Sequence, residues 1–155
     1  MEASPLFTKN LSIGYPSVHD HILFANLNLS LYSGQLVCFM GPNGIGKSTL
    51  IRTLAGSQKP ISGEIQGIGN KNVAVVLTER VNAGMMTARE LVSYGRYPYL
   101  GWSVKMTEED QTKIDEAVQQ VRIKDLLDKP IHELSDGQMQ MVMIARALAQ
   151  DTPVL

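Results

Sequence analysis

One short glycine-rich stretch constrains this chain more than any other feature of its sequence. It follows an apolar run at residues 36–40, which predicts a buried strand, and it precedes residues 49–55, which predict a helix ending at Gly56. The stretch has the spacing G-x-x-x-x-G-K-S, and its residues are Gly41, Pro42, Asn43, Gly44, Ile45, Gly46, Lys47, Ser48 and Thr49. Strand, glycine loop and helix in this order are typical of a phosphate-binding loop.

Each residue type in this loop suits phosphate binding. Glycines let the backbone curl so that N–H groups point inward, and the helix N-terminus adds the positive end of its dipole. We expect Lys47 to reach the β- and γ-phosphates of a nucleoside triphosphate, and Ser48 to offer its hydroxyl to Mg²⁺. The alternative is a chance glycine turn before a helix, which the flanking strand and helix disfavour.

Composition excludes several classes of protein. The 155 residues suffice for one domain or for part of a larger one, and a net charge of −1 gives no basic excess for nucleic acid. No apolar run approaches the ~20 residues of a membrane span, and residues 1–9 lack the pattern of a secretory signal. Cys38, the single cysteine, excludes an internal disulfide and is expected to be a packed core thiol. A cytoplasmic protein fits these features.

The N-terminal half predicts β-structure around the loop. Residues 5–31 read as strands, in which leucines alternate with polar residues, and residues 63–69 and 73–77 read as further strands. Tyr15 lies in an expected loop at residues 14–20. Its aromatic face suits stacking on a nucleotide base, and packing on the sheet is an equal alternative.

The C-terminal half predicts helices. Thr87 and Glu90 form a capping-box pattern for a first helix, and Thr107 caps a second helix. The apolar stripe of that second helix is Ile114, Ala117, Val118 and Val121. An aromatic loop at residues 96–102 and a short helix at 123–127 complete this half before the last helix, which opens at Ser135.

The opening of that last helix is a second motif, Leu134-Ser135-Asp136-Gly137-Gln138. Alone, S-x-x-Q is a capping box that many helices carry. After a phosphate-binding loop it makes the chain resemble the nucleotide-binding domain of an ABC transporter, whose signature reads L-S-G-G-Q. The chain departs from this signature at Asp136. Residues 89–99 are similar to the helical subdomain of importers for iron–siderophore complexes, haem and cobalamin.

The resemblance implies an α/β fold, that of a P-loop NTPase of ABC type with a mixed sheet. It divides the chain into an N-terminal antiparallel β part with the loop core at 1–78, a Q-loop-like linker at 79–86, a helical subdomain at 87–150, and the start of the Walker B strand at 151–155. The family's acidic residues for Mg²⁺ and water, and its histidine, would follow Leu155. We therefore interpret the chain as the N-terminal part of a longer ATPase, and expect the 155 residues alone to be inactive.

The resemblance also implies a mechanism. Two domains pair head to tail around two ATP molecules, and Ser135, Gly137 and Gln138 of one domain meet the γ-phosphate held by the other. Tyr15 takes the adenine-stacking position, and Lys47 serves catalysis. ATP hydrolysis then drives membrane permease subunits, which receive solute from a binding protein. Nucleic acid is not an expected partner, and the protein is expected on the inner face of the cell membrane.

One further departure concerns catalysis. The family has a glutamine after the strand that leads to the helical subdomain, and Glu79 stands at that place. A carboxylate oxygen ligates Mg²⁺, but an ionised carboxylate donates no hydrogen bond. We therefore expect Glu79 to act as a metal ligand and catalytic residue, and Asp136 to face away from the phosphate.

Two other functions stay open on the sequence. One is a soluble ABC-type ATPase that acts on nucleic acid or ribosomes, and binding to a membrane permease or to nucleic acid would separate it from an importer. The other is a non-hydrolytic nucleotide-binding module, which turnover by the complete protein would exclude.

Overall fold

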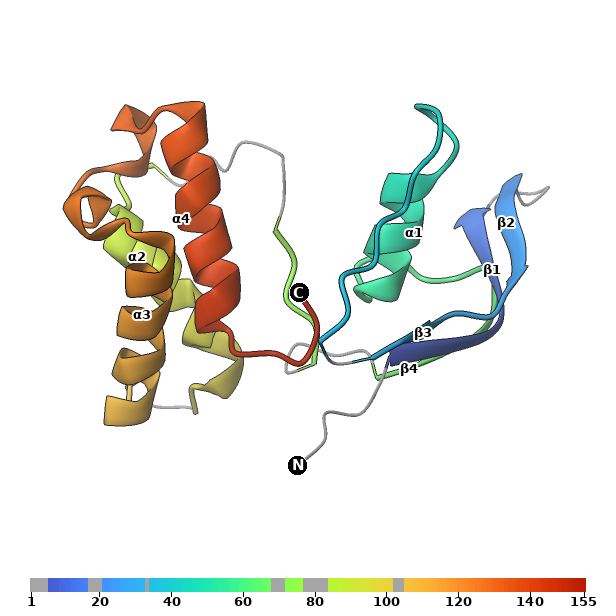
Figure 1. Ribbon diagram of the computed structural model, residues 1–155, viewed down its shortest axis with the longest axis horizontal. Coiled ribbons are helices and arrows are strands. Elements are labelled where there is room, and N and C mark those ends of the chain that lie inside the picture. The colour runs from blue at the N-terminus through green and yellow to red at the C-terminus, as the bar shows by residue number, and fades with distance from the viewer. Residues whose placement is uncertain (1–5, 17–20, 33, 68–71, 77–83, 102–104) are drawn as a thin grey trace. The chain divides into compact units, whose positions relative to one another are not determined.

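The computed structural model describes residues 6–16, 21–32, 34–67, 72–76, 84–101 and 105–155. The chain forms two compact units. The first comprises Met1–Val73 with Val154, and the second comprises Ala74–Pro153 with Leu155. The predicted α/β character is confirmed, with the strands in the first unit and most of the helices in the second (Figure 1).

The first unit is built on an antiparallel sheet in which β1 is the central strand (Figure 1). Strand β1 pairs with each of the other three, and the strands are β1 Leu6–Tyr15, β2 His21–Leu27, β3 Ser30–Leu31 and β4 Ser62–Gln66. The Thr8 hydroxyl spans the break between β2 and β3, because it donates to the Leu27 carbonyl at 3.0 Å and accepts from the Leu29 N–H at 2.9 Å. The β-structure predicted over residues 5–31 is confirmed where the structure describes it. Strand β4 confirms the first part of the strand predicted at residues 63–69, of which residues 68 and 69 lie outside the described residues.

Helix α1, Lys47–Leu54, packs on this sheet. Its apolar face joins the strand side chains in one buried cluster, which contains Leu6, Leu11, Ile13, Leu50 and Leu54. The helix ends as predicted, because Gly56 takes a left-handed φ of 75° and the Ser57 N–H returns to the Arg52 carbonyl at 2.9 Å.

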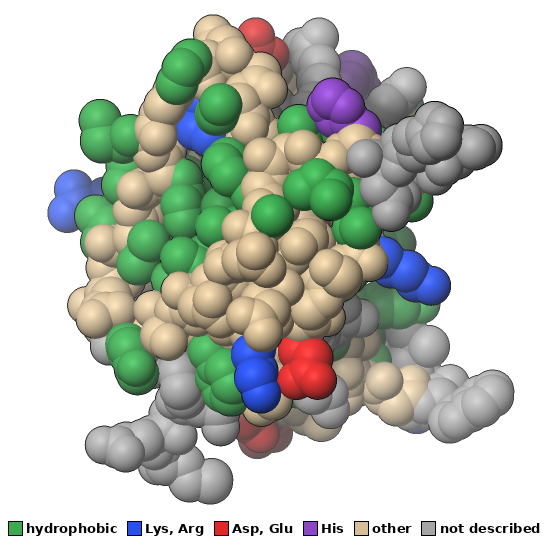
Figure 2. Space-filling model, turned by 90° about the vertical axis from the view of Figure 1, so that its right-hand side faces the viewer, with side chains coloured by type: hydrophobic (Ala, Val, Ile, Leu, Met, Phe, Trp, Pro, Cys, Tyr) green, Lys and Arg blue, Asp and Glu red, His purple; other side chains and the backbone are tan. Residues whose placement is uncertain are grey.

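The prediction of a buried strand at residues 36–40 is wrong. Within the described residues this run pairs with no strand, and Leu36 and Met40 are 98% and 88% exposed. Cys38 is also exposed, so it is not a core thiol. An apolar run favours a strand, but only a hydrogen-bonded neighbour makes one, and local sequence does not supply that neighbour. Figure 2 shows hydrophobic side chains on the surface of this face of the molecule.

The predicted strand at residues 73–77 is present only in part. Val73 forms a single parallel bridge with Val154, and the Val154 N–H donates to the Asn72 carbonyl at 3.1 Å. Ala74 is buried, but residues 74–76 form no regular strand, and Leu77 lies outside the described residues. The bridge is too short to make residues 73–76 a strand.

The second unit is helical (Figure 1). Its elements are α2 Ala88–Ser93, the 3-10 helix η1 Tyr94–Tyr99, α3 Glu108–Val121, the 3-10 helices η2 Lys124–Leu126 and η3 Ile131–Glu133, and α4 Asp136–Ala149. The three predicted longer helices are confirmed. The predicted aromatic loop instead contains most of η1, and the short helix predicted at 123–127 is the 3-10 turn η2. Across the described parts of the chain, no helix is long and apolar enough to cross a membrane.

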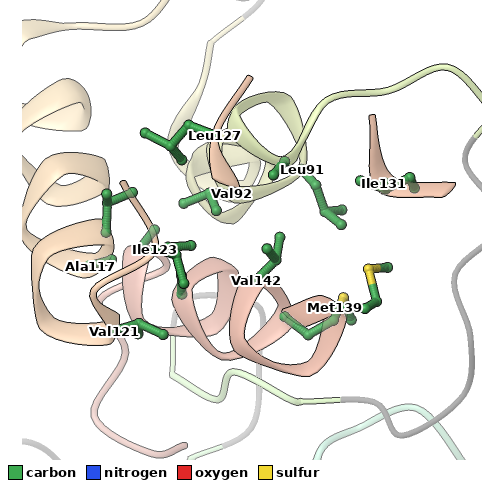
Figure 3. Packing of buried hydrophobic residues seen from close by; sticks show 14 of the residues in the cluster. Leu91, Val92, Ala117, Val121, Ile123, Leu127, Ile131, Met139 and Val142 are labelled. Atoms are coloured by element: carbon green, nitrogen blue, oxygen red, sulfur yellow. The ribbon is translucent and has the colours of Figure 1, made fainter. Parts of the chain in front are cut away.

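The core of this unit lies between α2, α3 and α4, as Figure 3 shows for Val92, Ala117 and Val142. All four residues of the predicted α3 stripe are buried there. Capping boxes fix the starts of the helices. Thr87 and Glu90 exchange bonds at α2, and Thr107 and Asp110 do so at α3.

Candidate functional site

The glycine-rich loop leads directly into α1, and two of its glycines are needed for its shape. Gly44 and Gly46 have φ angles of 81° and 108°, in the left-handed region that side chains with a Cβ rarely adopt. A Cβ on Gly46 would also lie 3.1 Å from side-chain atoms of Leu23 and Phe24. Gly46 is the N-cap of α1, so the loop ends at the helix N-terminus, where phosphate binding is predicted.

Lys47 is the first residue of α1, and its side chain returns over the loop. The ammonium Nζ donates to the carbonyls of Gly41 and Pro42, both at 2.7 Å. Ser48 follows at the exposed start of the helix, and the first turn of α1 contains no acidic residue. A cation together with a helix N-terminus whose first turn has no acidic residue gives this end a positive potential that suits an anion.

Tyr15 lies beside the start of the same helix. It is the last residue of β1 rather than part of a loop, and its hydroxyl lies 3.2 Å from Oγ1 of Thr49, which is buried in the first turn of α1. Tyr15 is 54% exposed, so the sheet does not bury this residue. The structure therefore brings Tyr15 to the start of α1, and its base-stacking role stays a prediction.

The residues present fit a magnesium-bound nucleotide. The described part of the chain contains no group of three His, Cys, Asp or Glu side chains able to hold a metal by themselves. Mg²⁺ in nucleotide sites is held mainly by phosphate and water oxygens with few protein ligands, and the exposed Ser48 hydroxyl is a suitable oxygen donor. Glu79 lies outside the described residues, so its predicted metal and catalytic roles stay predictions.

The second predicted motif forms the start of α4 in the helical unit. Ser135 is the N-cap. Its Oγ accepts from the Gln138 N–H at 3.3 Å, and the Gln138 side-chain oxygen accepts from the Ser135 N–H at 3.0 Å. The capping-box alternative is thus realised. A serine hydroxyl that accepts one bond keeps its own hydrogen for donation, so the cap is compatible with anion binding. Gly137 is exposed, and nothing lies within 4 Å of where its Cβ would be.

The structure therefore groups the predicted residues in two sets. Tyr15 and residues 41–49 lie together in the first unit, and Ser135, Gly137 and Gln138 lie together in the second. Asp136 occupies the first turn of α4 and is exposed. Its predicted orientation relative to a phosphate stays a prediction.

Sequence reasoning missed one polar pair. Arg96 and Asp110 form a buried ion pair with 2.9 Å between Nε and Oδ1. Arg96 lies in a stretch that resembles importer ATPases, but that resemblance assigned it no role. Asp110 occupies the third position of a helix, where an acidic residue is an ordinary cap. The pattern therefore carried no signal that the two side chains meet.

Comparisons with known proteins agree with the family that the sequence resembles. A family model described as "ABC transporter" matches residues 24–155. An uncharacterized ABC transporter ATP-binding protein of Methanocaldococcus jannaschii is 42% identical over 97% of this chain and 54% of its own length. The probable siderophore transport system ATP-binding protein YusV of Bacillus subtilis is 33% identical over 100% of this chain and 59% of its own length. The chain thus spans between half and two thirds of these relatives.

Solved structures share the fold. A putative metal-chelate type ABC transporter in an inward-facing conformation matches with a TM-score of 0.80 and 28% identity, over 97% of this chain and 58% of that one. A dimeric bacterial ABC transporter cassette matches with a TM-score of 0.78 and 26% identity, over 96% of this chain and 72% of that one. With the loop, the signature helix and the family match in agreement, the chain belongs to the ABC transporter family, in its ATP-binding component.

Proposed function

We propose that the chain is the ATP-binding part of an ABC importer ATPase, which couples ATP binding and hydrolysis to transport. The observation that carries this proposal is the Lys47 ammonium, bonded to the Gly41 and Pro42 carbonyls above a helix start that contains no acidic residue. A triphosphate would offer Lys47 stronger, charge-assisted partners than these neutral carbonyls. The backbone N–H groups of the loop and of α1 would bind the remaining phosphate oxygens.

Mg²⁺ would be held by the Ser48 hydroxyl, with Glu79 as the proposed second ligand. The metal would neutralise charge on the phosphates during transfer to water. Tyr15 would stack on the adenine. Its hydroxyl bond to Thr49 supports this role, because it holds the exposed ring beside the phosphate-binding helix.

We further propose that two copies pair head to tail around two ATP molecules. The exposed, capped start of α4 supports this pairing, because Ser135, Gly137 and Gln138 present a hydroxyl and helix-terminal N–H groups to an incoming γ-phosphate. A related cassette of known structure is described as dimeric. The partner copy thus completes each ATP site.

A groove in the helical unit supports a permease partner. It has a volume of about 710 Å³, and its lining combines Met85, Met86, Met106 and the side chains of η1 with polar and charged side chains of α2. Tyr94 and Tyr97 stack at its edge, with ring centroids 5.8 Å apart. Methionine and tyrosine surfaces of this kind suit the apolar face of a partner helix. We propose that a cytoplasmic helix of the permease occupies it, so that the protein works on the inner face of the membrane.

For the transported solute we propose iron–siderophore complexes, haem or cobalamin. The similarity of residues 89–99 to such importers supports this class, as do a relative named for siderophore transport and a structure titled as a metal-chelate type transporter. A solute-binding protein would deliver the solute to the permease.

Calorimetric titration of the protein encoded by the complete reading frame tests the ATP site. Lys47→Ala should weaken Mg-ATP binding by about tenfold or more, because a hydrogen bond to a charged group contributes about 1.5–3 kcal/mol. The control is Lys59→Ala, which removes a lysine charge from an exposed position of the same unit outside the loop. Equal affinities of Lys47→Ala and the wild type would exclude the assignment.

Co-purification with the co-expressed permease tests the groove. Tyr97→Glu should abolish recovery of the permease complex, because it replaces an aromatic side chain of the groove by a charged one, whereas Lys124→Glu at exposed η2 should not. If Tyr97→Glu recovers as much permease complex as the wild type, the permease binds at a site other than this groove. Uptake of labelled iron–siderophore, haem and cobalamin by cells with and without the gene then identifies the solute.

A further inference from the structure

A single buried side chain joins two helices of the second unit. The Arg96 side chain is only 5% exposed. Its Nε donates to Oδ1 of Asp110 at 2.9 Å, and its Nη1 donates to the Ala149 carbonyl at 3.0 Å. Asp110 lies in the first turn of α3, and Ala149 is the last residue of α4. Arg96 therefore ties the start of α3 to the end of α4.

The charges in this contact are matched. The last carbonyls of a helix lack intrahelical partners and carry partial negative charge, which a cation stabilises. The second carboxylate oxygen of Asp110 accepts from the Thr107 N–H at 2.9 Å and from the Thr107 hydroxyl at 2.8 Å. These bonds, above all the backbone bond from Thr107, hold the pKa of the Asp110 carboxyl below its ordinary value even though it is buried. The ion pair is thus charged at neutral pH.

Three neighbouring residues hold the same end of α4. A Cβ on Gly95 would lie 2.3 Å from the Arg146 carbonyl oxygen, so only glycine allows η1 to approach so closely. The Tyr99 ring lies under the guanidinium, with its centroid 4.0 Å from Cζ of Arg96. Lys113 Nζ lies 3.2 Å from Oδ2 of Asp151, just after the helix. Gly95, Arg96, Tyr99 and Lys113 together form what we term the clamp.

The clamp and the signature residues lie at opposite ends of one helix. Helix α4 has 14 residues, which at 1.5 Å per residue span about 21 Å. An α-helix is stiff over this length, so an anchor at its C-terminal end also determines the direction of its N-terminal end. We propose that Arg96 is a positioning residue that fixes the direction of α4, so that Ser135, Gly137 and Gln138 meet the nucleotide of a partner copy.

This inference rests on the proposed head-to-tail pairing around ATP. Its physical basis is directional bonding rather than net stability. Replacing a buried ion pair by apolar side chains is often neutral or even stabilising, so such a pair contributes geometry more dependably than free energy. The guanidinium is a planar fork with donors in fixed directions, whereas a lysine ammonium is a point charge. Lysine at position 96 would keep the charge without holding both acceptors.

The test uses the protein encoded by the complete reading frame. Arg96→Lys and Arg96→Met are compared with Arg89→Lys, which makes the same exchange at the exposed Arg89–Asp128 ion pair of the same unit. Sedimentation velocity with a non-hydrolysable ATP analogue measures the dimer dissociation constant. Fluorescence titration of dilute protein measures nucleotide binding to the single chain, and thermal unfolding measures stability.

We expect both Arg96 variants to weaken the dimer by about tenfold, the effect of one lost hydrogen bond to a charged group. Their single-chain nucleotide affinity should stay within about twofold, because the loop belongs to the other unit. Arg89→Lys should match the wild type. Arg96→Met alone should lose stability, because it leaves the Asp110 carboxylate buried without its partner. Combined with Asp110→Asn it should regain stability while its dimer stays weak, a split that a purely structural role would not produce.

Each other result overturns the inference. Arg96 does not position the helix if dimer strength follows thermal stability across the variants, or if both Arg96 variants dimerise like the wild type. In either case the proposed pairing stands. If the wild type itself fails to dimerise with nucleotide, the proposed pairing fails and the inference fails with it.

Discussion

The hydroxyl of Tyr15 lies 3.2 Å from Oγ1 of Thr49, which links the last residue of β1 to the first turn of α1. This contact separates two contributions of the tyrosine. The hydroxyl holds the side chain beside the helix, and the ring of this exposed residue offers its face to a base.

Tyr15→Phe and Tyr15→Ala measure these contributions in turn. Phenylalanine keeps the ring, so Mg-ATP affinity should fall no more than about threefold, while unfolding free energy drops by about 0.5–1.5 kcal/mol for the lost hydrogen bond. Alanine should weaken binding by about 5- to 150-fold, as expected for a lost stacking interaction of about 1–3 kcal/mol. Calorimetry and chemical denaturation give both quantities. Unchanged affinity in Tyr15→Ala would assign the ring a structural role only.

Glu79→Gln in the protein encoded by the complete reading frame should change ATP turnover more than thermal stability. Glutamine keeps an oxygen for Mg²⁺, removes a negative charge proposed to lie near the γ-phosphate, and adds a hydrogen-bond donor. Phosphate release and thermal unfolding are measured in parallel, with Glu64→Gln on β4 as the matched control. A large loss of stability with unaltered turnover would make Glu79 a structural residue.

Low pH should lower the unfolding free energy of the second unit, because it protonates Asp110. Its pKa is lowered in the folded chain, so its contribution to stability is fully present above the ordinary carboxyl pKa and is lost as the pH falls through the lowered value. At pH 7, Asp110→Asn should cost about 3–5 kcal/mol, because it leaves Arg96 buried and unpaired. That deficit relative to the wild type should shrink as the pH falls below about 4.

Urea denaturation across pH, followed with a probe in the second unit, measures this deficit. Asp125→Asn removes the same side chain from an exposed position and controls for the loss of any one charge. A deficit of Asp110→Asn that stays constant from neutral to acid pH would show that the Asp110 carboxylate contributes nothing through its charge.

Gly95→Ala should destabilise the second unit by about 1–3 kcal/mol, the usual effect of overpacking. The new methyl group would meet a backbone carbonyl of α4, which has no rotamer by which to move away. Gly101→Ala is the matched control, because none of the described residues outside its chain neighbours lies within 4 Å of its Cβ position. Equal melting curves for the two variants would mean that η1 can move away from α4 without a loss of thermal stability.

Features governed by local rules were predictable from the sequence. The caps at Thr87, Thr107 and Ser135 each follow from a residue and its third neighbour, and all three form. The stop of α1 at Gly56 follows from glycine's access to left-handed φ.

Features governed by distant partners were not predictable. The run at residues 36–40 has the composition of a strand, but strand formation depends on a neighbour, and the described residues provide none. Arg96 and Ala149 are 53 positions apart, and only the packing of η1 against α4 brings them together. For the candidate site, spacing identified the loop and the signature, but it gave no sign that Tyr15 bonds to Thr49.

The capping box at Ser135 has a consequence for the entropy of ligand binding. The first turn of α4 is already fixed by bonds between Ser135 and Gln138, so the backbone there loses little freedom when an anion arrives. A site that is ordered during folding retains more of its interaction energy as affinity than one that must order on contact. We therefore expect nucleotide binding to move the units of this protein as whole bodies and to leave the backbone of the first turn of α4 unchanged.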